Sequence, residues 1–228
     1  MTGYALDFET FRLAAPTATL SDEPAARGHA DLVEFRMDLA DEPLDQLTEY
    51  DGELPLLCTN RPTWEGGEAS DKGRLDALEA ASDHEAVVAV DVEVAAIEDG
   101  AQPTLDHVHG NDTAVVASVH DFDGTPESEQ LARLLARAAA AGDVGKLAVT
   151  AETREETLRL LSVTHAMTQE GATVATMAMG EVGAHTRAVA PRYGSKLGYA
   201  PVDPADATAP GQYDLETLAG LVESLAER

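Results

Sequence analysis

A lysine lies inside an apolar stretch of the chain, where a charged side chain needs a reason. Lys146 falls within the run 144–150, and only two other lysines, Lys72 and Lys196, occur among the 228 residues. Burial and neighbouring guanidinium groups both favour the neutral form of an amine. A neutral amine can attack a ketone and form an iminium, an electron sink that acidifies the adjacent carbon. Lys146 is therefore predicted to be a Schiff-base nucleophile.

A histidine follows another apolar run. His120 comes directly after Ala117-Ser118-Val119. Histidine has an unperturbed pKa of about 6.5, which suits proton transfer at neutral pH. A lone histidine is more often structural, but the other six lie in helical or loop stretches without comparable context. We therefore take His120 as the candidate acid and base.

Two polar pairs lie at the ends of expected strands. Glu34 and Arg36 are two residues apart in the run 31–37, so they share one face of a strand. Arg61 and Glu65 follow the run 54–60, together with two glycines. The alternatives are a surface ion pair and an ordinary loop with a glycine turn.

Three more polar residues occur late in the chain. Arg187 follows the run 172–177, and Thr208 and Gln212 flank a Pro-Gly turn after the run 197–202. Considered singly, they are typical of a helix-surface arginine and a surface turn. Like the second of the earlier pairs, all three follow an apolar run.

Eight apolar runs, separated by stretches of helical period, must position these residues. The predicted strands are 11–18, 31–37, 54–60, 86–92, 113–119, 144–150, 172–177 and 197–202. The clearest predicted helix is 126–141, which places three leucines on one face and ends before a glycine. Eight βα units favour a (β/α)8 TIM barrel over an open doubly wound sheet. No glycine-rich phosphate loop follows the first run, which further disfavours the open sheet.

We therefore predict an α/β protein with one barrel domain over residues 1–228, in which residues 1–10 add an N-terminal strand or hairpin at the barrel floor. Barrel active sites open at the carboxyl ends of the strands, yet Lys146 lies early in its run. Either the strand boundary is displaced by a few residues, or the long side chain reaches up through the barrel.

The composition restricts the partners. Forty-two acidic and fifteen basic residues give a net charge of −27, which repels nucleic acid and anionic membranes. No apolar run could cross a bilayer, and the first residues lack a secretion signal, so a cytoplasmic location is expected. One cysteine allows no internal disulfide, and no ligand cluster or cofactor motif is found, so neither metal nor cofactor is expected.

The charge profile is typical of proteins from extreme halophiles. Twelve of the fifteen basic residues are arginines, and aromatic residues make up 4% of the chain. Strong acidity is also typical of disorder, but the repeated Val, Leu and Ala runs favour a folded chain. Molar salt would screen the repulsion within such a carboxylate shell, so salt-dependent stability is expected.

Taken in order, these segments resemble the type I 3-dehydroquinate dehydratases over residues 11–212. The matching segments are Glu34-Phe35-Arg36-Met37-Asp38, Arg61 with Glu65-Gly66-Gly67, Ser118-Val119-His120-Asp121-Phe122, Lys146, Met177-Ala178-Met179-Gly180 with Arg187, and Ala209-Pro210-Gly211-Gln212. The resemblance implies a hydro-lyase that converts 3-dehydroquinate to 3-dehydroshikimate by syn loss of water, the third step of the shikimate pathway. It also implies a homodimer, since family members are often dimers.

The resemblance assigns a role to each residue. Lys146 would form the Schiff base with the C3 ketone, His120 would take the C2 proton and protonate the leaving C1 hydroxyl, and Glu65 would orient His120. The ring hydroxyls would contact Glu34, Arg36 and Arg61, and the carboxylate would contact Arg187. Thr208 and Gln212 would close over the ring from the eighth loop. Thr208 replaces a frequent serine, and Ala15 replaces a polar contact of the first strand.

Two other functions fit part of the pattern. A Schiff-base aldolase or transaldolase also carries a lysine on its sixth strand, but those enzymes usually bind phosphorylated substrates, and no glycine-rich phosphate cup follows the last two strands. A non-catalytic acidic binding barrel would tolerate replacement of Lys146 and His120.

Overall fold

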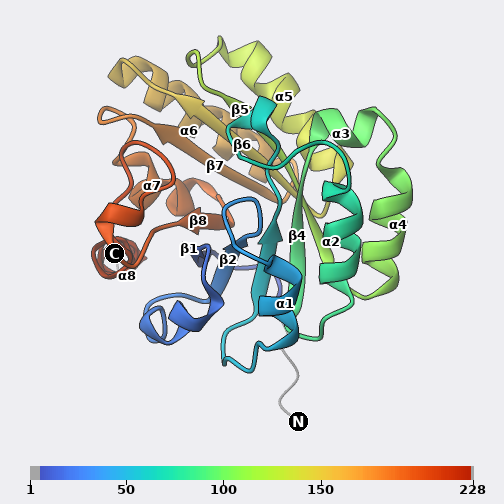
Figure 1. Cartoon of the computed structure of the whole chain (residues 1–228). Helices are drawn as coiled ribbons and strands as arrows, with labels where there is room; N and C mark the ends of the chain where they lie inside the picture. The colour runs from blue at the N-terminus through green and yellow to red at the C-terminus, as the bar shows by residue number, and fades with distance from the viewer. Residues whose placement is uncertain (1–5, 227–228) are drawn as a thin grey trace.

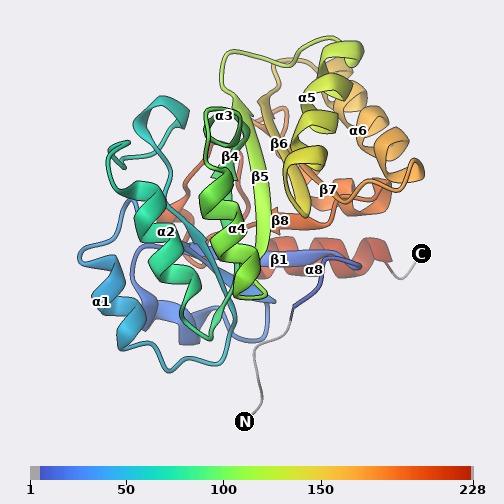
Figure 2. The ribbon, with the colours of Figure 1, turned by 90° about the vertical axis from the view of Figure 1, so that its right-hand side faces the viewer.

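The structure is a computed structural model and describes residues 6–226. Eight parallel strands alternate with helices that ring them on the outside (Figures 1 and 2), so the predicted (β/α)8 barrel is confirmed. The strands are β1 (Arg12–Thr17), β2 (Leu32–Arg36), β3 (Leu56–Thr59), β4 (Val87–Glu93), β5 (Ala114–Asp121), β6 (Val144–Thr150), β7 (Val174–Met179) and β8 (Leu197–Tyr199).

The connections contain α-helices and short 3-10 helices. The α-helices are α1 (Pro43–Thr48), α2 (Arg74–Ser82), α3 (Val94–Glu98), α4 (Gln102–Gly110), α5 (Ser128–Ala141), α6 (Arg154–Gln169), α7 (Thr186–Val189) and α8 (Leu215–Ala226). The 3-10 helices are η1 (Leu20–Ala25), η2 (Thr63–Glu65), η3 (Ala190–Tyr193) and η4 (Pro204–Asp206).

The strands follow one another around the sheet in sequence order. The order is β7-β6-β5-β4-β3-β2-β1-β8, and β1 pairs in parallel with both β2 and β8. A doubly wound sheet would instead reverse its strand order near the middle. The seam between β7 and β8 is joined by the Lys196 amide, which donates to the Val174 carbonyl at 2.7 Å, and by the Thr176 amide, which donates to Ser195 Oγ at 3.0 Å.

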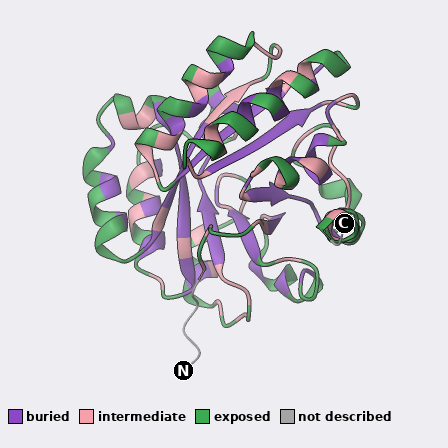
Figure 3. Cartoon of the chain, turned by 180° about the vertical axis from the view of Figure 1, so that it is seen from behind, coloured by how far each residue is buried: buried purple, intermediate pink, exposed green. Residues whose placement is uncertain are grey.

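Alternate residues of each strand face the barrel interior and the helices, as the period of two requires. The interior near the amino ends of the strands is apolar and includes Ala14, Leu32, Leu57, Val116 and Leu197. Two positions further along the strands, the side chains that face the interior are polar: Glu34, Thr59, Asp91, Ser118 and Lys146. The strands are buried and the outer helix faces are exposed (Figure 3).

The helices bury the stripes that their sequences predict. In α5, two of the three predicted leucines, Leu131 and Leu135, are fully buried together with Ala138, and the third, Leu134, is partly buried against the same cluster. In α6, Thr153 and Glu156 form a reciprocal capping box at the first turn. These two helices cover one side of the barrel, where they lie next to each other (Figure 2).

The observed boundaries differ from the predicted ones by a few residues. Strand β5 continues through His120 to Asp121, and β7 ends at Met179 rather than at residue 177. The first connection is the 3-10 helix η1 and not a longer helix, since Pro24 inside it lacks an amide hydrogen.

Part of the expected N-terminal strand can be compared with the structure. Residues 6–10 form no strand, although Leu6 and Phe8 pack against the interior cluster. Residues 1–5 lie outside the described residues.

Candidate active site

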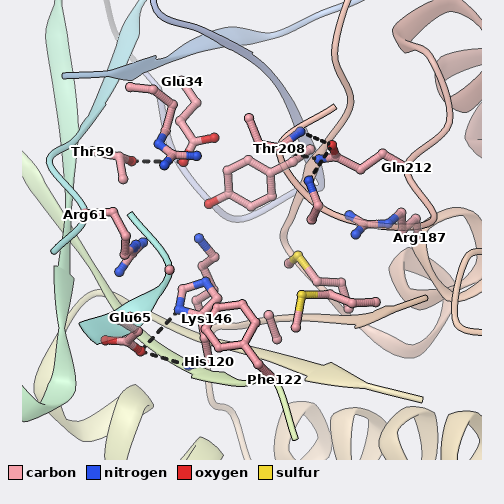
Figure 4. Close-up of a pocket in the computed structure, with 17 residues that line it drawn as sticks. Glu34, Thr59, Arg61, Glu65, His120, Phe122, Lys146, Arg187, Thr208 and Gln212 are labelled. Atoms are coloured by element: carbon pink, nitrogen blue, oxygen red, sulfur yellow. Dashed lines mark hydrogen bonds and ion pairs between the residues drawn. The ribbon is translucent and has the colours of Figure 1, made fainter. Parts of the chain in front are cut away.

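A pocket opens at the carboxyl ends of the strands, and all nine residues singled out from the sequence line it (Figure 4). They come from segments up to 178 positions apart in the chain, namely Glu34, Arg36, Arg61, Glu65, His120, Lys146, Arg187, Thr208 and Gln212. The barrel topology brings these segments together, because all parallel strands end at one rim.

Lys146 reaches the pocket from low in the barrel. Strand β6 has the predicted boundaries, so the early position of the lysine is real and its side chain extends toward the rim. The side chain is 6% exposed, and Nζ lies 2.9 Å from Asp91 Oδ2 and 4.5 Å from the centre of the Tyr199 ring. The amine is thus held between a carboxylate and an aromatic face.

Asp91 is the centre of a buried ion network. Its Oδ1 accepts from Ser118 Oγ at 2.6 Å and lies 2.7 Å from Arg61 Nη2, while its Oδ2 contacts Lys146. Burial alone would raise the pKa of Asp91, but the charges of Arg61 and Lys146 outweigh burial and lower it. Asp91 is therefore an ionised partner of the lysine.

Asp91 was missed as a site residue, although the sequence contains a signal for it. It lies inside the predicted strand 86–92, two residues before Glu93. Like Lys146, it is a charged residue inside an apolar run. Burial and neighbouring guanidinium groups were the surroundings expected for Lys146. The structure adds a carboxylate at hydrogen-bond distance, so the expectation was incomplete.

His120 and Glu65 form a second buried pair. Glu65 Oε1 accepts from the His120 amide at 2.8 Å and lies 3.1 Å from the His120 Nδ1 atom. Burial raises the pKa of Glu65 to about 7. Burial, together with the charges of Arg61 and Lys146, lowers the pKa of His120 well below its usual value. His120 is therefore a neutral imidazole at neutral pH, and Glu65 holds one of its ring nitrogens.

The three arginines of the pocket differ in how far they are already paired. Arg36 makes a bidentate contact with Asp38, at 2.8 and 2.6 Å. Arg61 bonds Glu93 and Ser118 through Nη1 in addition to its contact with Asp91. In the described part of the chain, Arg187 Nε and Nη2 are buried and have no hydrogen-bond partner.

Arg187 is therefore the arginine whose donors remain available to a ligand. Burial lowers its pKa to about 10, which still leaves the guanidinium charged at neutral pH. An unpaired buried guanidinium is costly, and a carboxylate that enters the pocket would relieve that cost through a bidentate contact.

Other parts of the pocket wall offer an acceptor and a loop. Glu34 is buried, and its Oε1 accepts from Thr59 Oγ1 at 2.9 Å. In the loop after β8, the amides of Thr208 and Ala209 donate to Gln212 Oε1 at 2.8 and 3.2 Å. The Gly180 amide donates to the carbonyl of Pro210 and ties this loop to the end of β7.

The two glycines after β3 set the position of Glu65. Gly66 has a φ of +80°, and a Cβ there would lie 2.6 Å from Phe122 Cζ. A Cβ at Gly67 would lie 2.1 Å from the Arg61 carbonyl oxygen. The loop can turn back on β3 only because both side chains are absent.

The described residues lack two other kinds of feature, a metal site and a membrane span. Residues 6–226 contain no group of three or more His, Cys, Asp or Glu placed to hold a metal ion. Within the same range, no helix has the length and apolar character that crossing a membrane requires.

Comparisons with known proteins agree with this geometry. Residues 15–227 match the sequence model of the type I 3-dehydroquinase family. The 3-dehydroquinate dehydratase of Haloarcula marismortui is 57% identical over 96% of this chain and 98% of its own, and that of Halobacterium salinarum is 52% identical over 96% and 100%.

Solved structures show the same similarity. The 3-dehydroquinate dehydratase of Geobacillus kaustophilus superposes with a TM-score of 0.83 at 28% identity, over 96% of this chain and 92% of that one. The type I enzyme of Clostridium difficile, solved with covalently modified comenic acid, superposes with a TM-score of 0.83 at 25% identity, over 100% and 97%. This chain belongs to the type I 3-dehydroquinase family.

Proposed function

We propose that this chain is a hydro-lyase of the shikimate pathway that removes water from 3-dehydroquinate through a Schiff base on Lys146. The observation that carries the proposal is the buried Lys146 Nζ, which lies in one pocket with the neutral imidazole of His120. The names of the halophilic relatives supply the substrate, and the covalent ligand in the Clostridium difficile structure supports covalent chemistry in the family.

The first part of the reaction joins substrate and enzyme. The carboxylate of the substrate would bind the free donors of Arg187, and a ring hydroxyl would donate to Glu34. The free amine of Lys146 attacks the C3 ketone and forms a carbinolamine. One proton taken up from solvent lets the carbinolamine hydroxyl leave as water, and the C=N bond that forms carries the positive charge of the iminium. Asp91, 2.9 Å from Nζ, is the counter-ion for the positive iminium.

The second part is elimination. The iminium acidifies C2, and His120 takes a proton there and then protonates the departing C1 hydroxyl, so that loss of water is syn. Hydrolysis of the iminium then releases 3-dehydroshikimate and restores the lysine.

The other pocket residues support these steps. Glu65 holds the imidazole in place, and Arg61 acts chiefly by fixing Asp91, since the terminal nitrogens of Arg61 already contact protein atoms. Arg36, Thr208 and Gln212 complete the contacts to the ring.

Borohydride trapping tests the proposal. Incubation with 3-dehydroquinate and borohydride is expected to give a stable adduct on Lys146, which mass spectrometry detects. Lys146→Met should abolish the adduct, and the matched variant Lys72→Met, at a lysine outside the pocket, should not. Absence of any wild-type adduct favours the binding barrel, and an adduct formed only with an aldol substrate favours the aldolase.

The proposal extends to assembly and location. By analogy with the family, we expect a homodimer in the cytoplasm. Light scattering on a sizing column tests the dimer, and a mass equal to one 24.0 kDa chain would contradict it.

A further inference from the structure

Two buried side chains of the pocket carry polar atoms that no other protein group satisfies. Among the described residues, the buried side-chain nitrogens and oxygens without either a hydrogen bond or an ion pair are Arg187 Nε, Arg187 Nη2 and the hydroxyl of Tyr199. Buried polar groups in folded proteins are nearly always hydrogen-bonded, so such exceptions need an explanation. For Arg187, the explanation is the substrate carboxylate that it would bind. Tyr199 was not singled out from the sequence.

Tyr199 lies where the proposed reaction begins. It is the last residue of β8, it is 4% exposed, and Lys146 Nζ lies 4.5 Å from the centre of its ring. The fields of Glu34 and Asp91 reach it, and together with burial they raise the pKa of its phenol well above the usual value. The phenol therefore keeps its proton and is available as a hydrogen-bond donor.

Each oxygen of the substrate can be matched to a pocket side chain by whether it donates or accepts hydrogen bonds. Glu34 is a carboxylate and can only accept, which suits a ring hydroxyl that donates. Arg187 can only donate, which suits the carboxylate. The remaining substrate oxygen that can only accept is the ketone oxygen. It is bonded to the carbon that Lys146 attacks, and the free donor beside Lys146 is the Tyr199 hydroxyl.

We propose that the Tyr199 hydroxyl donates a hydrogen bond to the ketone oxygen of 3-dehydroquinate and stabilises the negative charge that develops there as Lys146 attacks. The lone pair of Nζ forms the C–N bond, and the π pair of the carbonyl moves onto oxygen. The attacking nitrogen then gives that oxygen a proton, which yields the neutral carbinolamine, and the phenol keeps its own proton. This inference rests on the proposed function.

The test compares how fast the lysine is trapped. Tyr199→Phe removes the hydroxyl and keeps the ring over Nζ. In single-turnover experiments with excess enzyme, the borohydride-trapped adduct on Lys146 should form about 100- to 1,000-fold more slowly than in the wild type, as is typical for loss of one donor to a developing oxyanion. The rate of elimination from the preformed Schiff base should change much less.

A second tyrosine provides the matched control. The Tyr50 hydroxyl donates to the Leu54 carbonyl at 2.6 Å, and Tyr50 does not line the pocket. Tyr50→Phe should lower the Tm and leave the trapping rate unchanged. Tyr199→Phe should slow trapping without lowering the Tm, because its hydroxyl has no protein hydrogen bond to lose.

The outcomes separate this inference from the function on which it rests. A wild-type protein that forms no adduct contradicts the proposed function. A wild-type adduct together with equally fast trapping in Tyr199→Phe contradicts the role of the phenol alone. Slow trapping accompanied by a lower Tm means that the phenol is structural, which also overturns the inference.

Discussion

At the scale of residues, the site depends on charges that are buried but paired. Asp91 is fully buried and contacts Lys146, Arg61 and Ser118 at once. Removing one partner of a buried ion pair is far more destabilising than removing an exposed one, because the other charge is left uncompensated. Two predictions follow from these pairs.

The first concerns Asp91. Asp91→Asn should lower the free energy of unfolding by about 3–5 kcal/mol, since it leaves Lys146 and Arg61 with too little negative charge. It should also lower kcat/KM, because the iminium loses its counter-ion. Chemical denaturation and steady-state kinetics measure these effects.

Asp83→Asn is the control for this variant. Asp83 is an exposed carboxylate that contacts His107, so its replacement should change the free energy of unfolding much less than Asp91→Asn does. Equal effects of the two substitutions would mean that Asp91 is not part of an energetically coupled network.

The second prediction concerns the pH dependence that Glu65 causes. Its pKa is about 7 in the folded protein against 4.5 for a free glutamate. A carboxyl group whose pKa is raised on folding stabilises the fold below pH 4.5 relative to high pH, and this contribution is lost as the pH rises through 7. The difference corresponds to about 3 kcal/mol.

Glu65→Gln cannot titrate, so its stability relative to the wild type should increase between pH 4.5 and pH 8.5. Urea denaturation at several pH values measures this. Glu98→Gln is the control, because the hydrogen bond from Arg137 lowers the pKa of Glu98. The contribution of Glu98 is lost only as the pH falls below 4.5, so the relative stability of this variant should stay nearly constant between pH 4.5 and pH 8.5. A relative stability of Glu65→Gln that does not vary with pH would contradict the raised pKa.

At the scale of elements, the geometry of short loops positions the site. The segment after β3 carries Arg61 and Glu65, and it folds back so closely that Gly67 lies against the Arg61 carbonyl. The Gly67 amide also donates to the carbonyl of Pro62 at 3.0 Å. The position of Glu65, which contacts His120, therefore depends on two glycines.

Gly67→Ala tests this dependence. The added methyl group would meet backbone that cannot rotate away, so the loop must shift and Glu65 must move from His120. We expect a loss of about 1–3 kcal/mol in stability and at least a tenfold loss in kcat/KM. Gly110→Ala, where a Cβ meets nothing within 4 Å, should retain wild-type activity. An active, stable Gly67→Ala protein would contradict the steric argument.

The sequence predicted the elements better than it predicted the contacts between them. Periodicity located all eight strands, because each buried strand needs an apolar run, and Lys146 and His120 were evident as polar interruptions of such runs. The roles of Asp91 and Tyr199 could not be predicted in this way. They depend on the stagger between strands, which brings β4, β6 and β8 side chains to one level of the barrel, and on which donors other residues already occupy.

At the scale of the whole molecule, acidity sets the conditions under which the barrel is stable. The net charge of −27 falls on a chain of 228 residues, and the arginines of the pocket act against that background. The Debye length shortens from about 10 Å at 0.1 M salt to about 3 Å at 1 M, so molar salt screens repulsion between surface carboxylates.

We therefore expect the Tm and kcat/KM to rise from dilute buffer to molar KCl. Folding should gain more from screening than substrate binding loses, because the pocket charges are buried and screened less. Thermal denaturation and kinetics across a KCl series measure both quantities, with sucrose as the uncharged control. A flat or falling profile would contradict the argument.

The seam between β7 and β8 is a place where a bound substrate would add to the contacts between strands. Few hydrogen bonds hold this edge, yet the proposed substrate would touch Lys146 on one side of it and Tyr199 on the other, with Arg187 between. A bound molecule would therefore add contacts that link the two sides of this seam. Occupancy should slow transient opening there and protect the enzyme from proteolysis while it works.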